Sequence, residues 1–143
     1  MREILFRGKR KVCDELVYGF PFISRNGEYK IKWYDGYYGS SKTSEIYPES
    51  IGQFTGLTDK NGEKIFEGDV VKFTDSPFGY SYTGVVCFNE GSFCIKYEYW
   101  EKEKFHRIGQ TDKWRDMGAS GIVTYQYEIL GNIHDNPELL ENP

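Results

Sequence analysis

Two-residue turn sequences divide much of this chain into short runs in which apolar and polar residues alternate. Asn26-Gly27 and Asn61-Gly62 are strong signals for tight hairpins, and Glu90-Gly91 lies midway between two further alternating runs. The chain has 16 glycines, 12 tyrosines, 10 phenylalanines and 3 tryptophans. Because large rings pack well across a pleated surface, this composition favours strands. The sequence therefore predicts a mainly β protein.

The first third of the chain is predicted to hold three strands. Residues 3–8 form the first and residues 16–23 the second, which an Asn-Gly turn joins to residues 28–34. Gly19 and Pro21 interrupt the second run, so we expect an edge strand or a bulge there. Residues 35–45 are loop-like and are the best candidate boundary between two tightly packed parts. These parts are an N-terminal β subdomain, residues 1–45, and a second β subdomain, residues 46–143.

The middle of the chain predicts two more hairpins. Asn61-Gly62 should form a hairpin tip, and Gly68 should hold a tight turn before a strand at 70–73, because glycine accepts positive φ freely. In the hairpin 84–100, a two-residue turn at Glu90-Gly91 places Phe88 opposite Phe93 and Cys87 opposite Cys94. One side of that hairpin is then a plausible core face, made of Val86, Phe88, Phe93, Ile95, Tyr97 and Tyr99.

The last third combines a charged segment with a long strand. Residues 101–121 are weakly patterned and punctuated by glycine, which predicts an insertion or a mobile excursion. Asp135 or Asn136 is expected to cap a short C-terminal helix that Pro137 begins. A strand is predicted at 121–131, with one face formed by Val123, Tyr125, Tyr127 and Ile129.

Charge and cysteine content indicate the cellular compartment. The net charge is −4, and an acidic chain repels nucleic-acid phosphates on average, although a local basic patch is compatible with binding. The N-terminus has no apolar signal segment and no run is long enough to span a bilayer, so we expect a cytoplasmic protein without membrane contact. Three cysteines, of which Cys13 has no obvious mate, should then remain thiols.

No motif in the sequence assembles a reactive site. Residues 36–43 resemble a phosphate-binding loop, but Ser41 stands where glycine must precede the lysine, which favours a flexible loop. Residues 59–63 lack the alternating ligands of a calcium loop. The Asn-Gly hairpin turn explains the composition of this segment. Neither histidine has a catalytic partner beside it in the sequence. Metal-ligand spacing is absent among Cys87, Cys94, His106 and His134. We therefore expect no enzyme activity, no cofactor and no metal.

One stretch that combines aromatic and basic side chains is the candidate interaction surface. Its members are Trp100, Phe105, Arg107, Trp114 and Arg115, accompanied by Lys102, Lys104, His106 and Lys113. Such residues stack on bases and contact phosphates, but Trp and Arg also dominate protein interfaces. Acidic neighbours cancel much of the positive field, which favours self-association and leaves nucleic acid as the alternative. Aromatic residues expected outside the core support self-association too: Tyr37, Tyr38, Tyr80 and Tyr82.

Several longer stretches of the chain form a series of motifs in a fixed order. The opening match is Ile4-Leu5-Phe6-Arg7-Gly8, followed by Val17-Tyr18-Gly19. The most specific block begins with Ile-Gly-Gln-Phe-Thr-Gly-Leu at 51–57, and continues through Asp-Lys-Asn-Gly at 59–62 and Ile-Phe-Glu-Gly-Asp-Val-Val at 65–71. The closing match is residues 127–140. These motifs cover essentially the whole chain, and they resemble those of the YopX-like proteins of phages and prophages.

The resemblance implies a fold and a mode of action. It implies a first part of coiled β-sheet, a second part like an SH3-like barrel, and large homo-oligomers encoded by a phage or prophage. It supplies no catalytic residue, because the family has no assigned activity. We therefore expect a non-enzymatic, homo-oligomerising accessory protein that acts by binding. The alternative is a nucleic-acid-binding module in phage replication or recombination.

Overall fold

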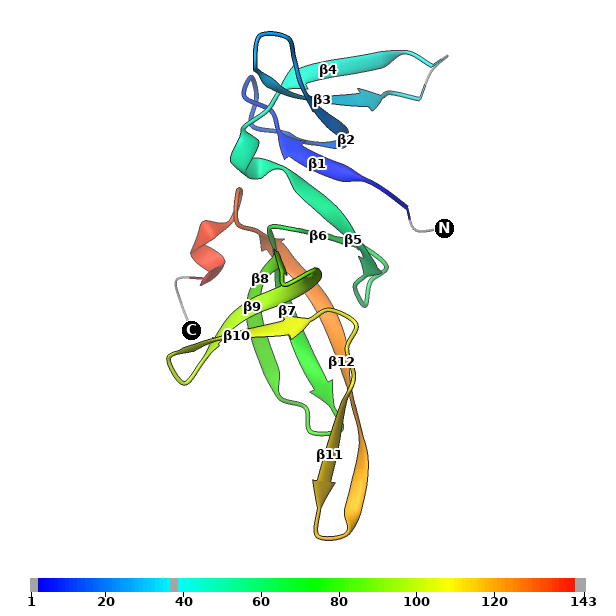
Figure 1. Ribbon diagram of the computed structural model, residues 1–143, viewed down its shortest axis with the longest axis vertical. Coiled ribbons are helices and arrows are strands. Elements are labelled where there is room, and N and C mark those ends of the chain that lie inside the picture. The colour runs from blue at the N-terminus through cyan, green and yellow to red at the C-terminus, as the bar shows by residue number, and fades with distance from the viewer. Residues whose placement is uncertain (1–2, 37–38, 141–143) are drawn as a thin grey trace. The chain divides into compact units, whose positions relative to one another are not determined.

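The computed structural model describes residues 3–36 and 39–140 (Figure 1), so Tyr37 and Tyr38 lie outside the described residues. Its strands are β1 (Phe6–Lys9), β2 (Leu16–Ile23), β3 (Tyr29–Tyr34), β4 (Ser41–Glu45), β5 (Gly52–Thr58), β6 (Lys64–Phe66), β7 (Asp69–Ser76), β8 (Ser81–Asn89), β9 (Ser92–Tyr99), β10 (Lys102–Arg107), β11 (Asp112–Asp116) and β12 (Ala119–Asn132). Two 3-10 turns, η1 (Pro48–Ser50) and η2 (Pro137–Leu140), are the helical segments within the described ranges. Neither could cross a membrane. The mainly β prediction is confirmed.

The chain divides into two compact units, residues 1–56 and 57–143. In the first unit, antiparallel strands lie in the order β4-β3-β2-β1-β5, and Val17, Ile31 and Ile46 form a small core. The sequence placed the boundary after residue 45, whereas the structure places it after residue 56. The reason is physical: Ile46 is fully buried in the first core, and β5 pairs with β1.

Strand β2 changes partner at Gly19. Its first half pairs with β1, ending with Gly19 opposite Phe6, and its second half pairs with β3, beginning with Phe20 opposite Lys32. A Cβ atom at Gly19 would clash with the carbonyl oxygen of Lys32, so only glycine fits. The strand therefore lies inside the sheet, and the prediction of an edge strand is wrong. Pro21 is tolerated because the register with β1 has already ended.

Residues 41–45 form the edge strand β4, so the prediction of a loop is wrong for this part of 35–45. β4 pairs with β3, with Ser41 opposite Tyr34 and Glu45 opposite Lys30. Its first three residues are exposed. A strand at the edge of a small sheet needs little apolar patterning, because little of it is buried. The serine-rich composition therefore concealed it.

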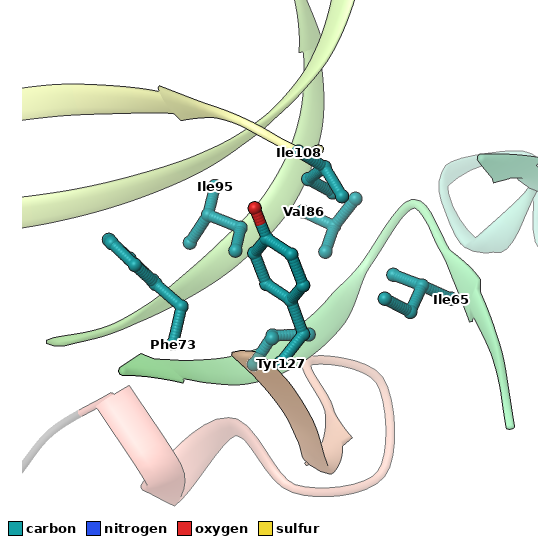
Figure 2. Close-up of a cluster of buried hydrophobic side chains, with 7 residues drawn as sticks. Ile65, Phe73, Val86, Ile95, Ile108 and Tyr127 are labelled. Carbon is teal, nitrogen blue, oxygen red and sulfur yellow. The ribbon is translucent and has the colours of Figure 1, made fainter. Parts of the chain in front are cut away.

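The second unit is built on a curled sheet with the strand order β10-β9-β8-β7-β12-β11 (Figure 1). It forms about half of a barrel, in agreement with the barrel part that the resemblance implies. The core residues are Ile65, Val71, Phe73, Val86, Ile95, Ile108 and Tyr127, and Figure 2 shows the Tyr127 ring in the middle of this cluster.

The predicted register of the β8–β9 hairpin is confirmed. Phe88 lies opposite Phe93 and Cys87 opposite Cys94, with Glu90 and Gly91 both at positive φ in the turn. The predicted core face is correct only at its centre. Phe88 and Tyr99 are 58% and 46% exposed, because they lie near the ends of the hairpin, beyond the curl of the sheet.

Strands β10 and β11 occupy the segment predicted to be an insertion or excursion. β10 pairs with β9 along its whole length, from Lys102 opposite Tyr99 to Arg107 opposite Cys94. β11 pairs with β12, where Trp114 lies opposite Gly121. Both are edge strands that alternate in charge more than in hydropathy, so the period-two apolar signal is weak.

The turns at 59–69 follow the prediction. Asn61 and Gly62 lie in a hairpin turn, and Gly68, at φ +90°, precedes β7. The buried Asp59 organises the first turn: Oδ1 accepts the N–H groups of Asn61 and Glu63 at 2.9 and 3.0 Å. Its Oδ2 accepts the N–H of Ile129 at 3.1 Å, which ties the turn to β12.

The C-terminal strand β12 has the predicted core face, with Val123 and Tyr127 buried. The expected helix after it is a single 3-10 turn, η2. Asn132 organises the turn before η2, because its Oδ1 accepts the N–H groups of His134 and Asp135 at 3.0 and 2.9 Å. The Asn136 side chain is turned back toward the Asn132 N–H.

Candidate functional site

The structure separates the five residues of the predicted interaction surface into two groups. Trp100, in the turn before β10, is 80% exposed, and Phe105 and Arg107 are exposed on β10 itself. Trp114 and Arg115 lie on β11, at the other end of the hydrogen-bonded strand order. The Trp114 ring covers Gly121 and meets the Phe78 ring edge-on, with centroids 5.8 Å apart. The residues of the predicted surface are therefore divided between the two strands that end the hydrogen-bonded order.

His106 lies inward on β10 and belongs to the core. Its ring stacks on Phe73 with centroids 4.4 Å apart and meets the edge of Tyr125 at 4.3 Å. Its Nε2 is 2.7 Å from the Tyr127 hydroxyl, which also accepts the Gly109 N–H at 2.9 Å. Burial lowers the pKa of His106 to about 4, so the ring is neutral at neutral pH. It anchors β10 against β12.

Asp112 extends this anchor at the start of β11. It accepts a hydrogen bond from the Tyr125 hydroxyl and two from Gln110 Nε2, at 2.9 and 3.0 Å. Gln110 Oε1 in turn accepts the Arg107 N–H at 2.8 Å. Burial, and then the Asp112 carboxylate, raise the pKa of Tyr125. The phenol therefore stays protonated and holds the end of β10 in place.

Three further tyrosines continue the cluster beside this anchor. The Tyr82 ring lies 5.3 Å from Tyr97 and 5.9 Å from Tyr99, measured between centroids. Burial raises the pKa of Tyr82 and of Tyr97. Protonated phenols donate hydrogen bonds and present ring faces, but they are not nucleophiles. The arrangement is suited to binding and to rigidity.

The contacts of His106 and the neighbouring tyrosines fix β10, and they thereby fix the side chains on its outward face. Alternation along the strand turns Glu103, Phe105 and Arg107 away from the core while His106 faces it. The Arg107 N–H bonds to Gln110 and not to β9, so the N–H groups of Glu103 and Phe105 also point to the edge. Phe105 is 42% exposed. The edge therefore presents an apolar ring between a base and an acid, and the acid, Glu103, forms an exposed ion pair with Lys96 of β9 at 3.4 Å.

Sequence reasoning named Phe105 and Arg107 but missed the groups that hold them. Asp112, Tyr125 and Tyr127 come together only through tertiary contacts. The one sequence signal for them was the tyrosine alternation on β12, which indicated a core face and not a polar network. Across residues 3–36 and 39–140, no three His, Cys, Asp or Glu side chains gather as metal ligands would.

The two paired cysteines are expected to be slow thiols. Cys94 is buried and Cys87 half-buried, and neither forms a disulfide in the structure. Burial raises the pKa of both thiols, and only the thiolate is reactive. A thiol reagent should therefore label the exposed Cys13 quickly and the other two slowly, giving three thiols under denaturing conditions. One thiol after lysis under alkylating conditions would instead mean that Cys87 and Cys94 are joined.

Several of the motif stretches can now be understood structurally, since Asp59, Gly68 and Asn132 each organise a turn. A protein-family model described as YopX protein matches residues 5–141. The chain belongs to the YopX family. No curated protein matches it at a significant level. The match names the family over residues 5–141, and the candidate site rests on the geometry of β10.

Proposed function

We propose that this YopX-family protein acts by binding and not by catalysis, as a homo-oligomeric accessory protein of a phage or prophage in the bacterial cytoplasm. The observation that carries self-association is the edge of β10. Its outward face carries Glu103, Phe105 and Arg107 in this order. When two copies pair antiparallel, the acid of each copy meets the base of the other. An edge strand with free backbone groups readily recruits a second chain.

The proposed contact has twofold symmetry about Phe105. In an antiparallel pair centred there, each Phe105 lies opposite the Phe105 of the second copy. Glu103 then lies opposite Arg107 of the second copy, and Arg107 opposite its Glu103, as an isologous interface requires. Opposite charges placed directly across two strands stabilise the pair, whereas like charges destabilise it.

The β10 edge also fits this role because it is held before any partner arrives. His106 and Tyr127 fix the inner face of the strand. Gln110 accepts the Arg107 N–H, which leaves the N–H groups of Glu103 and Phe105 for a second copy. A rigid edge loses little conformational entropy on binding, so more of the contact energy remains as affinity. Trp100, 80% exposed in the adjacent turn, adds apolar area beside the edge.

Charge reversal tests the proposal. Glu103→Arg should place two cations opposite each other and lower the self-association constant about tenfold or more, since each charge pair contributes up to about 1 kcal/mol and repulsion adds to the loss. The double variant Glu103→Arg/Arg107→Glu restores complementary charges and should recover assembly. Light scattering over a micromolar concentration series gives the mass, against 16.7 kDa for a single chain.

The matched control is Asp116→Arg, the same type of change on the exposed edge strand β11. It should leave the mass unchanged. A single-chain mass for the unaltered protein at all concentrations would refute self-association itself. An assembled protein that Glu103→Arg leaves intact would keep self-association and remove the β10 edge as its contact.

A further inference from the structure

The first unit carries exposed rings and lysines on one face of the β2–β3 hairpin. Phe20 and Phe22 on β2 are 50% and 40% exposed, and Tyr34 on β3 is 58% exposed. They lie on the face opposite the core, because the core residues Val17 and Ile31 occupy the alternate positions. We name Phe20, Phe22, Lys30, Lys32 and Tyr34 the β2–β3 outer face.

Strand register interleaves the lysines with the rings. Lys32 lies directly opposite Phe20, and Lys30 directly opposite Phe22. Lys32 Nζ is also 5.9 Å from the centroid of the Tyr34 ring. Residues opposed in this way have Cβ atoms about 5 Å apart, so lysine and phenylalanine side chains are neighbours across this face. Arg25, exposed in the turn that joins the strands, adds a third cation at the end of the hairpin.

The charge of the chain is divided unequally between its units. Residues 1–56 contain 9 Lys and Arg against 7 Asp and Glu, a formal charge of +2. Residues 57–143 contain 9 against 15, a charge of −6. The net acidity of the whole chain therefore conceals a positive first unit. A polyanion would be attracted to the β2–β3 outer face and repelled by the second unit.

We propose that the β2–β3 outer face binds single-stranded nucleic acid. Unpaired bases stack on Phe20, Phe22 and Tyr34, and the phosphates lie against Lys30 and Lys32. Alternate residues on a strand are roughly 7 Å apart, which lets neighbouring bases of an extended strand each meet one ring. A duplex hides its base faces, so it cannot make the stacking contacts.

This site differs from the aromatic and basic stretch at 100–115 that the sequence singled out. There, acidic side chains such as Glu101 and Glu103 alternate with the basic ones, within the unit of charge −6. On the β2–β3 outer face, the carboxylate opposite Lys30 is Glu45, and it already pairs with Lys11 at 3.0 Å. Lys30 itself lies 3.7 Å from a carboxylate oxygen of Glu28, a partly exposed pair that salt screens, so the positive charge of this face is least compensated at Lys32.

Fluorescence anisotropy of the full chain with labelled oligothymidylate of about 12 nucleotides tests the site. Phe20→Ala/Phe22→Ala should weaken binding roughly 5- to 100-fold for each ring lost. For the unaltered chain, log affinity should fall with log salt concentration with a slope of about −2, from three cations. Lys30→Glu/Lys32→Glu should weaken binding at low salt and reduce that slope by about 1.4.

Matched controls lie in the second unit: Phe88→Ala, an exposed ring at a hairpin tip, and Lys104→Glu, an exposed lysine of β10. Both should bind like the unaltered chain, and circular dichroism should show that every variant is folded. Labelled oligouridylate distinguishes RNA from DNA, and a labelled duplex should bind more weakly than either single strand. Supporting results are losses confined to the β2–β3 variants.

Three results would overturn the proposal. The first is no binding of either single strand at low salt, and the second is binding that survives Phe20→Ala/Phe22→Ala. The third is unchanged binding by these variants together with a lower mass in light scattering, which would assign the face to a second copy of the chain. Self-association through β10 is measured without nucleic acid, so the two proposals can fail independently.

Discussion

Asp59→Asn is expected to destabilise the second unit by about 3 kcal/mol. The carboxylate accepts three backbone N–H groups, from Asn61, Glu63 and Ile129. Asparagine has one acceptor oxygen where aspartate has two. Its side-chain NH2 group therefore takes the place of one carboxylate oxygen and faces a backbone N–H donor. A buried donor left without an acceptor costs about 1–3 kcal/mol, and a hydrogen bond to a charged group contributes about 1.5–3 kcal/mol.

Urea denaturation followed by tryptophan fluorescence measures this change, since Trp100 and Trp114 report on the second unit. Asp116→Asn, at an exposed position of β11, is the control and should change stability by less than about 0.5 kcal/mol. If Asp59→Asn were as stable as the control variant, the proposed tie between the turn and β12 would contribute nothing. Such a result would leave the turn chemistry at Asn61-Gly62 as the main determinant of this hairpin.

Lowering the pH from neutral to about 4 is expected to cost about 3 kcal/mol of stability through His106 alone. Burial lowers the pKa of His106 from 6.5 to about 4 in the folded chain. Between these values the unfolded chain binds a proton that the folded chain excludes, so stability rises with pH across this window. The stability is complete above the unfolded pKa of 6.5 and is lost as the pH falls toward 4.

His106→Phe isolates this effect. Phenylalanine preserves an aromatic ring against Phe73 and Tyr125, and the Tyr127 hydroxyl keeps the Gly109 N–H as a donor. The difference in unfolding free energy between this variant and the unaltered chain should therefore change by about 3 kcal/mol between neutral pH and pH 4. His134→Gln, at the other histidine, should reproduce the original pH dependence. Parallel profiles for all three chains would mean that His106 is not buried as a neutral ring.

The acid sensitivity of Asp59 should appear at lower pH than that of His106. Burial raises the pKa of Asp59, but the N–H donors of Ile129, Glu63 and Asn61 outweigh burial and leave the pKa below the ordinary aspartate value of 3.8. The stability from this carboxylate is present above that value and is lost as the pH falls through the folded pKa. The two groups therefore act in separate pH windows.

Local chemistry explains which parts of the fold the sequence could predict. The β8–β9 register follows from the length of one turn, because Glu90 and Gly91 at positive φ leave Phe88 opposite Phe93. Gly62 and Gly68 likewise mark turns by the conformation that they permit. The alternation of apolar residues on β12 indicated its core face, since that strand is buried on one side.

Other parts of the fold and of the candidate site could not be predicted from the sequence, because they depend on contacts between residues distant in sequence. β4 and β10 are edge strands with little buried area, so their residues carry little periodic signal. The anchor of the candidate site joins His106 to Tyr127 and Asp112 to Tyr125 across different strands. The division after residue 56 depends on the burial of Ile46 beside Val17 and Ile31, a contact that composition at 35–45 does not reveal.

Gly19 has a consequence for how the first unit presents its outer face. A one-residue slip of β2 would bring Tyr18 or Phe20 to the place where the Lys32 carbonyl leaves room for a hydrogen atom only. Every slipped pairing is therefore excluded by steric overlap, and the slip would also exchange the two faces of the strand. A residue without a side chain thus keeps Phe20 and Phe22 directed to solvent and Val17 directed to the core.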